Sequence, residues 1–298
     1  MPNDAARPDT VLEVVVTQLD DDVPLLGVCA GFEDGAWRHR QLSYDLVQWA
    51  TDWILSADEL EEFSSTNHLD LFNKALSRVY ETIDYKRRGE VGELLLHIIL
   101  RTFLKSERLI TRIYFKDAAN DTVKGFDAVH VVESGQEDDG TSSLELWLGE
   151  AKFYTDSRSA MAEIYEELRV HLQRDYLRYE FAAISDKIPR AYPHRDEIRA
   201  LLARKTSLDA AFRRVVIPVF ITYDSDVTGK HGESSQVYLQ EIEAELAQEW
   251  ETFKRRYSSW TLPRTVRAHL FLLPMATKQT LVDAFDGRLK AWQTATKP

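Results

Sequence analysis

Glu150 and Lys152 stand two residues apart at the end of an apolar run. At this spacing a carboxylate and an ammonium could act together in catalysis or in ligand binding. Side chains of a strand alternate between its two faces, so a strand over residues 144–153 would point both charges the same way as Leu146 and Leu148. A charge on a buried face must be paired or must bind a ligand. Taken alone, the two residues are equally well explained by an ion pair at a strand end.

A second acid interrupts an apolar strand face upstream. Asp127 shares its parity with three valines of residues 123–132, so a strand here would place a lone carboxylate on an apolar face. His130 falls on the opposite face and is interpreted as a structural histidine. The repetition of this pattern favours a common site for Asp127, Glu150 and Lys152.

A long helix predicted over residues 76–104 supplies a third group of charges. Most of its surface is apolar, and such a helix is buried. A narrow stripe at helical spacing is charged and consists of Lys86, Glu90, Glu93, His97 and Arg101. The stripe is expected to meet the polar groups of the two strands, with Glu93 preferred over Glu90. His97 is interpreted as a buried, hydrogen-bonded histidine rather than a ligand.

Carboxylates converging with one lysine are the groups used in metal-dependent phosphodiester hydrolysis. Asp and Glu oxygens suit Mg²⁺ or Mn²⁺, which complete their shells with water and substrate phosphate. Such a metal polarises the phosphoryl oxygen and lowers the pKa of a bound water. Glu93, Asp127 and Glu150 are therefore predicted metal ligands, and Glu90 is an additional candidate. Lys152 would orient the attacking water and neutralise developing charge, so all but Glu90 are predicted to be catalytic.

These residues also carry a family resemblance. Three motifs resemble the PD-(D/E)xK nuclease superfamily and are, in chain order, Gly-Glu93, Gly-Phe-Asp127 and Gly-Glu150-Ala-Lys152. They span about residues 80–175. With the flanking runs Arg87–His97 and Glu150–Tyr154, the sequence resembles more narrowly the HamA family, the effector subunits of the Hachiman anti-phage defence system.

The resemblance implies a DNase that acts with a superfamily-two helicase partner, HamB, which restrains the nuclease and senses aberrant DNA. The sequence departs from the superfamily pattern at Phe126, where the motif name has proline. RecB-like members carry Gln-x-x-x-Tyr on the next helix, whereas Gln173 is followed at that spacing by Leu177. Gln173 is a candidate for a DNA contact, without the tyrosine that accompanies it in those members. Arg87 and Arg88 are candidates for contacts to backbone phosphate.

The elements that position these residues follow an α/β order, and a central mixed sheet flanked by helices is expected. The resemblance makes this a restriction-endonuclease-like core. Strands are predicted over residues 10–18, 25–32, 109–116, 124–132, 144–153, 215–223 and 266–273. Helices are predicted over residues 41–56, 68–80, 76–104, 157–180, 194–204, 236–256 and 277–293. The acidic residues 133–140 are predicted to form an exposed hairpin loop.

No clean linker divides the chain, so one compact unit is expected. We divide it into an N-terminal strand and helix elaboration (1–75), the nuclease core (76–225) and a C-terminal helix–strand–helix segment (226–298). A hydrophobic content of 44% argues against disorder. The single cysteine excludes an internal disulfide and fits a reducing cytoplasm. No apolar run reaches the length of a membrane span, so a cytoplasmic protein is predicted.

The net charge of −12 bears on function, because proteins that grip DNA usually present a basic surface. Weak intrinsic affinity for DNA is therefore expected, and a partner or a metal would have to supply what the surface lacks. Two alternatives stay open. The chain could be a non-catalytic binding or regulatory subunit on a degenerate nuclease fold, or a nuclease directed at RNA.

Overall fold

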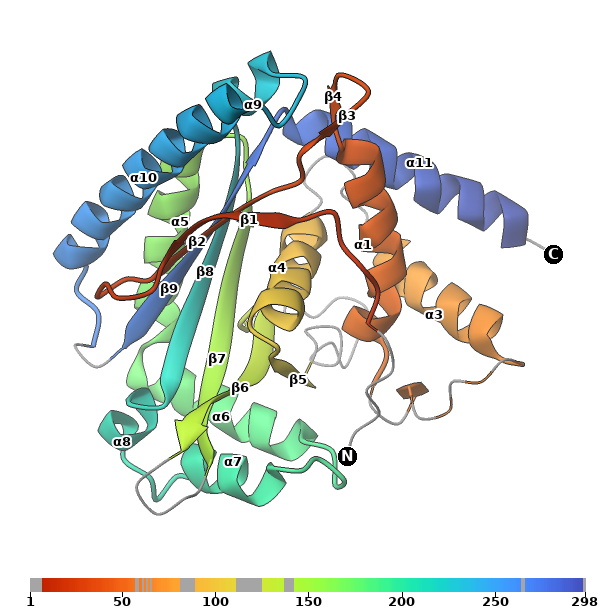
Figure 1. Ribbon diagram of the computed structural model, residues 1–298. Helices are drawn as coiled ribbons and strands as arrows, with labels where there is room; N and C mark the ends of the chain where they lie inside the picture. The colour runs from red at the N-terminus through yellow and green to blue at the C-terminus, as the bar shows by residue number, and fades with distance from the viewer. Residues whose placement is uncertain are drawn as a thin grey trace.

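The computed structural model describes residues 7–56, 59–60, 62, 64, 66–80, 89–110, 125–136, 142–263 and 266–296. At its centre is a seven-stranded mixed sheet, which Figure 1 shows between two layers of helices. In spatial order its strands are β1 (Glu13–Gln18), β2 (Leu25–Cys29), β9 (Arg267–Met275), β8 (Val215–Asp224), β7 (Ser142–Phe153), β6 (Ala128–Gln136) and β5 (Glu107–Ile110). The four strands from β2 to β7 run parallel, and antiparallel strands extend the sheet on both sides.

Helices cover both faces of the sheet (Figure 1). One face carries α1 (His39–Ile54), α3 (His68–Tyr80), α4 (Gly89–Phe103) and α11 (Lys278–Thr296). The other carries α5 (Ser157–His171), α6 (Arg174–Lys187), α7 (Arg195–Leu202), α8 (Leu208–Phe212) and α10 (Gln236–Ser259). A short α9 (Asp226–Lys230) follows β8. No helix among the described residues is long and apolar enough to cross a bilayer.

Alternation along the central strands separates two apolar layers. In β8, Val216 and Phe220 pack in the layer with α1 and α4, whereas Ile217 and Val219 pack in the layer with α5 and α10. Every residue of β8 before Asp224 is buried. This fits the prediction of a strand covered on both faces, and the mixed α/β class predicted from the sequence is confirmed.

Of the predicted long helix over residues 76–104, the structure describes residues 76–80 as the end of α3 and residues 89–103 as α4. Residues 81–88, which include Arg87 and Arg88, lie outside the described part. The single helix predicted over 157–180 is wrong, because the structure has two helices there, α5 and α6. It breaks at Gln173, whose ψ of 140° is extended and cannot continue a helix.

Smaller differences concern strand ends and turns. The predicted loop over 133–140 is wrong at its start, because β6 continues to Gln136, which pairs with Ser142. The predicted strand over 109–116 is described only up to Ile110, at the end of β5. A hairpin of β3 (Phe32–Glu33) and β4 (Ala36–Trp37) was not predicted.

Candidate active site

The end of β7 brings Glu150 and Lys152 to one face of the sheet, as predicted. The alternating residues Leu144, Leu146 and Leu148 belong to the apolar layer of α5 and α6, which fixes the face that the two charges share. Glu150 is only 1% exposed and Lys152 8%. Burial therefore removes both charges from bulk water, and each requires partners within the protein.

Asp127 lies beside Glu150, at the start of the neighbouring strand. Its backbone N–H donates to the carbonyl of Gly149 at 2.8 Å, and its Oδ2 accepts from the backbone N–H of Ala151 at 2.9 Å. Together the two bonds hold Asp127 against the backbone on either side of Glu150. The structure therefore brings Asp127, Glu150 and Lys152 together, and their role as a site stays a prediction.

The electrostatics of Glu150 reflect this crowding. Burial raises the pKa of its carboxyl well above the ordinary value, and the negative charges of Asp127 and Glu167 raise this pKa further, against the opposing charge of Lys152. Two acids that resist simultaneous ionisation in a dry site would both be stabilised as carboxylates by a divalent cation. The donor set, made of oxygens only, suits Mg²⁺ or Mn²⁺.

Lys152 reaches from β7 to the facing helix α5. Its Nζ lies 2.6 Å from Oε2 of Glu167 and 3.5 Å from Oε1 of Glu163. Burial alone would lower the pKa of Lys152, but the bond to Glu167 and the charges of Glu167, Asp127 and Glu150 outweigh it and raise the pKa above the ordinary value. The ammonium is therefore charged and held in place.

His171, the last residue of α5, contacts the carboxyl of Glu150. Its Nδ1 lies 2.6 Å from Oε1 of Glu150. The imidazole packs against Phe126 and stacks on Tyr176 of α6, with ring centroids 5.2 and 4.9 Å away. Burial lowers the pKa of His171 although Glu167, Asp127 and Glu180 surround it with negative charge. A neutral imidazole therefore orients one oxygen of Glu150.

The sequence reasoning missed Glu163, Glu167 and His171. The signal that could have found them is their spacing of four residues, which places all three on one face of a helix directly after the strand of Glu150 and Lys152. The prediction of one helix through residue 180 drew attention to Gln173 instead. Gln173 does not cap α6 with its side chain, and it lines a cleft beside the site.

Glu93 comes from the other side of the sheet. It is buried on α4, in the layer of helices opposite Glu150 and Lys152. Helix α4 packs closely against β7 at Gly92, where an added Cβ would stand only 3.0 Å from Cβ of Phe153. Among the described residues, no group of three or more His, Cys, Asp or Glu side chains is placed to hold a metal ion. A role for Glu93 as a ligand stays a prediction, as does one for Glu90.

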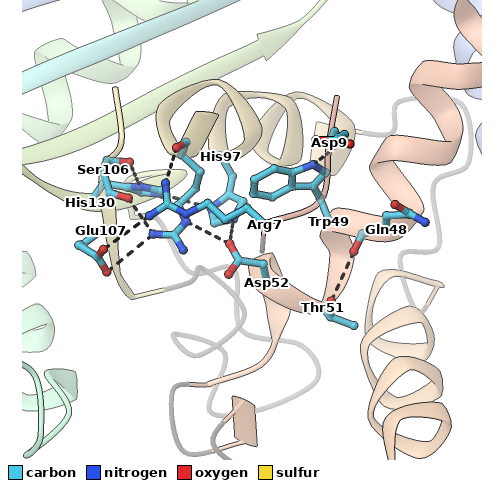
Figure 2. A network of polar contacts seen from close by, with 11 residues as sticks. Arg7, Asp9, Gln48, Trp49, Thr51, Asp52, His97, Ser106, Glu107 and His130 are labelled. Carbon is cyan, nitrogen blue, oxygen red and sulfur yellow. Dashed lines mark hydrogen bonds and ion pairs between the residues drawn. The ribbon is translucent and has the colours of Figure 1, made fainter. Parts of the chain in front are cut away.

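His97 and Arg101 of the predicted helix stripe belong to a separate, largely buried network, whose histidines are shown in Figure 2. Nε2 of His97 lies 2.7 Å from Oδ2 of Asp52 in α1, and its Nδ1 lies 3.2 Å from Nε2 of His130 in β6. Nδ1 of His130 lies 2.8 Å from the hydroxyl of Ser106. Arg101 donates to both Asp52 and the carbonyl of Ser106. The interpretation of His97 and His130 as buried structural histidines is confirmed.

In a comparison with protein-family models, residues 7–289 match the HamA family. A search of the curated proteins finds no match.

Proposed function

The chain belongs to the HamA family, and from this premise we propose that it is a metal-dependent deoxyribonuclease, the effector of a Hachiman-type defence complex under the control of a helicase partner. The observation that supports the proposal most directly is the buried group of Asp127, Glu150 and Lys152 on one face of the sheet. Two like charges are costly to bury side by side, and a bound cation would offset that cost. Family membership supports the biological setting, and the buried acids with their lysine support the reaction class.

In this proposal, Asp127 and Glu150 would hold Mg²⁺ or Mn²⁺, and water and substrate phosphate would complete the shell. Glu93 is a further candidate ligand, carried by α4 on the opposite face of the sheet. The metal, when bound, would polarise the scissile phosphate and lower the pKa of a water. Lys152 neutralises negative charge that develops on the phosphorus centre and orients the attacking water. Its ammonium can do so because carboxylates on α5 keep it protonated.

Two residues of α5 act as positioning residues. Glu167 fixes the ammonium of Lys152 through the 2.6 Å contact, and His171 holds one oxygen of Glu150. Apolar packing of α5 and α6 keeps Glu150 and His171 from bulk water, which strengthens the contact between them. The sheet and α5 thereby organise the site before a substrate arrives.

The test is cleavage of DNA by the purified chain, alone and with its helicase partner, in Mg²⁺ or Mn²⁺ and in EDTA. Glu150→Gln and Lys152→Met should abolish cleavage, because they remove a ligand and the cation at nearly constant volume. Glu166→Gln is the matched control, since Glu166 lies on α5 but is exposed and pairs with Arg169. Equal cleavage by all three variants and the wild type would refute the proposal.

A non-catalytic subunit on a degenerate nuclease fold is the second candidate. It is favoured by the acidic balance of the chain and by the lack of a three-ligand group among the described residues. It predicts no heat when Mn²⁺ is titrated into the protein and normal defence by the Glu150→Gln variant. A parallel assay on RNA of the same sequence would reveal an RNA-directed enzyme.

A further inference from the structure

A polar cleft of about 880 Å³ opens between α6 and the segment that follows α7. Three arginines line it together with two aspartates and Gln173. We propose that this cleft binds the phosphate backbone of the nucleic acid that enters the candidate active site. This inference rests on the proposed function, because it assigns the cleft to the same substrate.

The cleft begins where the acidic site ends. Gln173 follows two residues after His171, whose imidazole contacts Glu150 and stacks on Tyr176 of α6. A nucleic-acid strand whose scissile phosphate lies at Glu150 could therefore continue past His171 and along α6. The acidic site itself would repel such a strand, so the neighbouring surface has to hold it.

The segment that provides most of the cleft is basic in a chain that is strongly acidic. Residues 174–214 contain ten Lys and Arg against six Asp and Glu, a net charge of +4, whereas the whole chain carries −12. This segment forms α6, α7 and α8, which lie together at one end of the sheet in Figure 1. Local positive charge of this kind is what phosphate binding by counterion release requires.

Two of the cleft arginines are available to a ligand. Arg174 and Arg204 are exposed, and within the described part of the chain neither guanidinium has a hydrogen-bond or ion-pair partner. The third, Arg178, is already used, since it donates to the carbonyls of Ala203 and Thr206 at 3.3 and 2.6 Å. Arg178 thus ties α6 to the loop that carries Arg204 and fixes the spacing of the two free cations.

The mixed lining also indicates the class of ligand. Asp175 and Asp186 share the cleft with the arginines, so its own net charge is small. A phosphodiester carries one negative charge per unit and offers acceptors to guanidinium groups, whereas the two aspartates would repel a polyphosphate. The cleft therefore fits a chain of phosphodiesters better than a nucleoside triphosphate.

The experiment measures binding of a labelled oligonucleotide of about 30 residues by fluorescence anisotropy, in EDTA, from about 50 to about 200 mM salt. Single-stranded DNA, duplex DNA and RNA of one sequence are compared. The test variant is Arg174→Glu/Arg204→Glu. The control variant is Lys230→Glu/Arg255→Glu, which reverses the same charge on α9 and α10, away from the cleft.

The test variant should bind about tenfold or more weakly, and its salt slope should fall by about 1.4 to 1.8, because each phosphate contact contributes about 0.7 to 0.9. The control should keep the slope of the wild type. Equal affinity of the test variant and the wild type would overturn the cleft assignment, as would a wild type that binds none of the three probes. Loss of helicase binding with unchanged oligonucleotide binding would overturn it in favour of a protein-docking surface. Cleavage measured with the Glu150→Gln variant decides the nuclease proposal separately, since the binding assay needs no metal.

Discussion

For the single residue Glu150, the protonation state that favours the stability of the fold is the opposite of the one that a metal site needs. A carboxyl whose pKa is raised by burial is most stable in the fold when protonated, so its contribution to stability is present at low pH and is lost as pH rises through the folded pKa. Ionised Glu150 therefore destabilises the fold at neutral pH, whereas a metal site needs it ionised. Residues that serve a ligand commonly carry such a cost.

We predict that Glu150→Gln raises the free energy of unfolding by on the order of 1 kcal/mol at neutral pH while abolishing cleavage. Glutamine keeps the shape of the side chain and removes the buried charge. Urea unfolding in EDTA measures the first effect, and a cleavage assay measures the second. A variant that is less stable than the wild type at neutral pH and no more stable at any higher pH would contradict this reading of Glu150.

Glu167 offers a test of positioning by pH. Its charge raises the pKa values of both Glu150 and Lys152, so Glu167→Gln should lower both. The acidic limb of the pH–rate profile, set by ionisation of Glu150, should then move to lower pH by up to about one unit. Glu166→Gln should leave the limb in place. A lower rate without any movement of the limb would mean that Glu167 is only structural.

The grouping of Asp127, Glu150 and Lys152 could be predicted from the sequence, because strand parity alone decides which side chains share a face. For Glu167 and His171, the four-residue spacing predicts a shared helix face, but their contacts with Lys152 and Glu150 depend on where α5 crosses β7. That crossing is a tertiary relation between a strand and a helix, and no local pattern encodes it. Glu93 shows the same limit, since helical periodicity placed it on a stripe but did not determine which face of the sheet α4 covers.

Among the elements, the largely buried network joins α1, α4 and β6 with Ser106, which directly precedes β5 (Figure 2). We predict that Ser106→Ala costs about 1–3 kcal/mol of stability, because Nδ1 of His130 loses its partner while staying buried. Ser77→Ala, at an exposed position of α3, is the control and should change stability by less than about 0.5 kcal/mol. Thermal or urea unfolding measures both. Equal effects of the two substitutions would show that the Ser106 contact contributes nothing.

The buried histidines also predict acid sensitivity. Burial lowers the pKa of His97 from 6.5 to about 4, so the unfolded chain binds more protons than the fold between these values. Stability should therefore fall as pH decreases through this window, by on the order of 1 kcal/mol per pH unit for each such histidine. His269 has the same lowered pKa of about 4. His269→Phe should make the fall shallower, and an unchanged slope of unfolding free energy against pH would argue against this cause.

Among the elements, long periodic or fully apolar segments such as β8 and α10 were predicted within a few residues of their observed bounds. The errors fell at interruptions. One is the break at Gln173, and another is the β3–β4 hairpin, where Asp34 and Gly35 both have positive φ. An Asp-Gly pair is a signal for such a two-residue turn, but the strands beside it are too short for alternation to reveal.

At the scale of the whole molecule, the sheet draws strands from all three segments into which the sequence was divided. β2 pairs with β9, and β9 pairs with β8, so the C-terminal segment supplies a strand between N-terminal and central ones. Helix α11 packs on α1 in the same way. Sequence patterns could give the order of these elements along the chain but not their order in the sheet, because strand pairing over long separations is a tertiary property.

We predict that a chain ending at residue 225 does not fold, because it loses β9 from the middle of the sheet and leaves β2 and β8 unpaired on that side. Soluble expression and circular dichroism measure the outcome. A chain ending at residue 296, which keeps α11 complete, is the control. A folded product from the shorter chain would show that the central segment is an independent domain.

In the row of hydrogen bonds from Asp52 through His97 and His130 to Ser106, each shared hydrogen has one possible position. The ionised carboxylate of Asp52, whose pKa is lowered by its contacts with His97, can only accept, so Nε2 of His97 carries the proton. A neutral His97 then accepts at Nδ1, which obliges His130 to donate from Nε2 and to accept the hydroxyl proton of Ser106. Both imidazoles are thereby locked in a single tautomer, and every donor in the row points toward Asp52. Nitrogen-15 NMR should therefore show both His97 and His130 as the Nε2–H tautomer. A change of tautomer in one ring would require a change in the other.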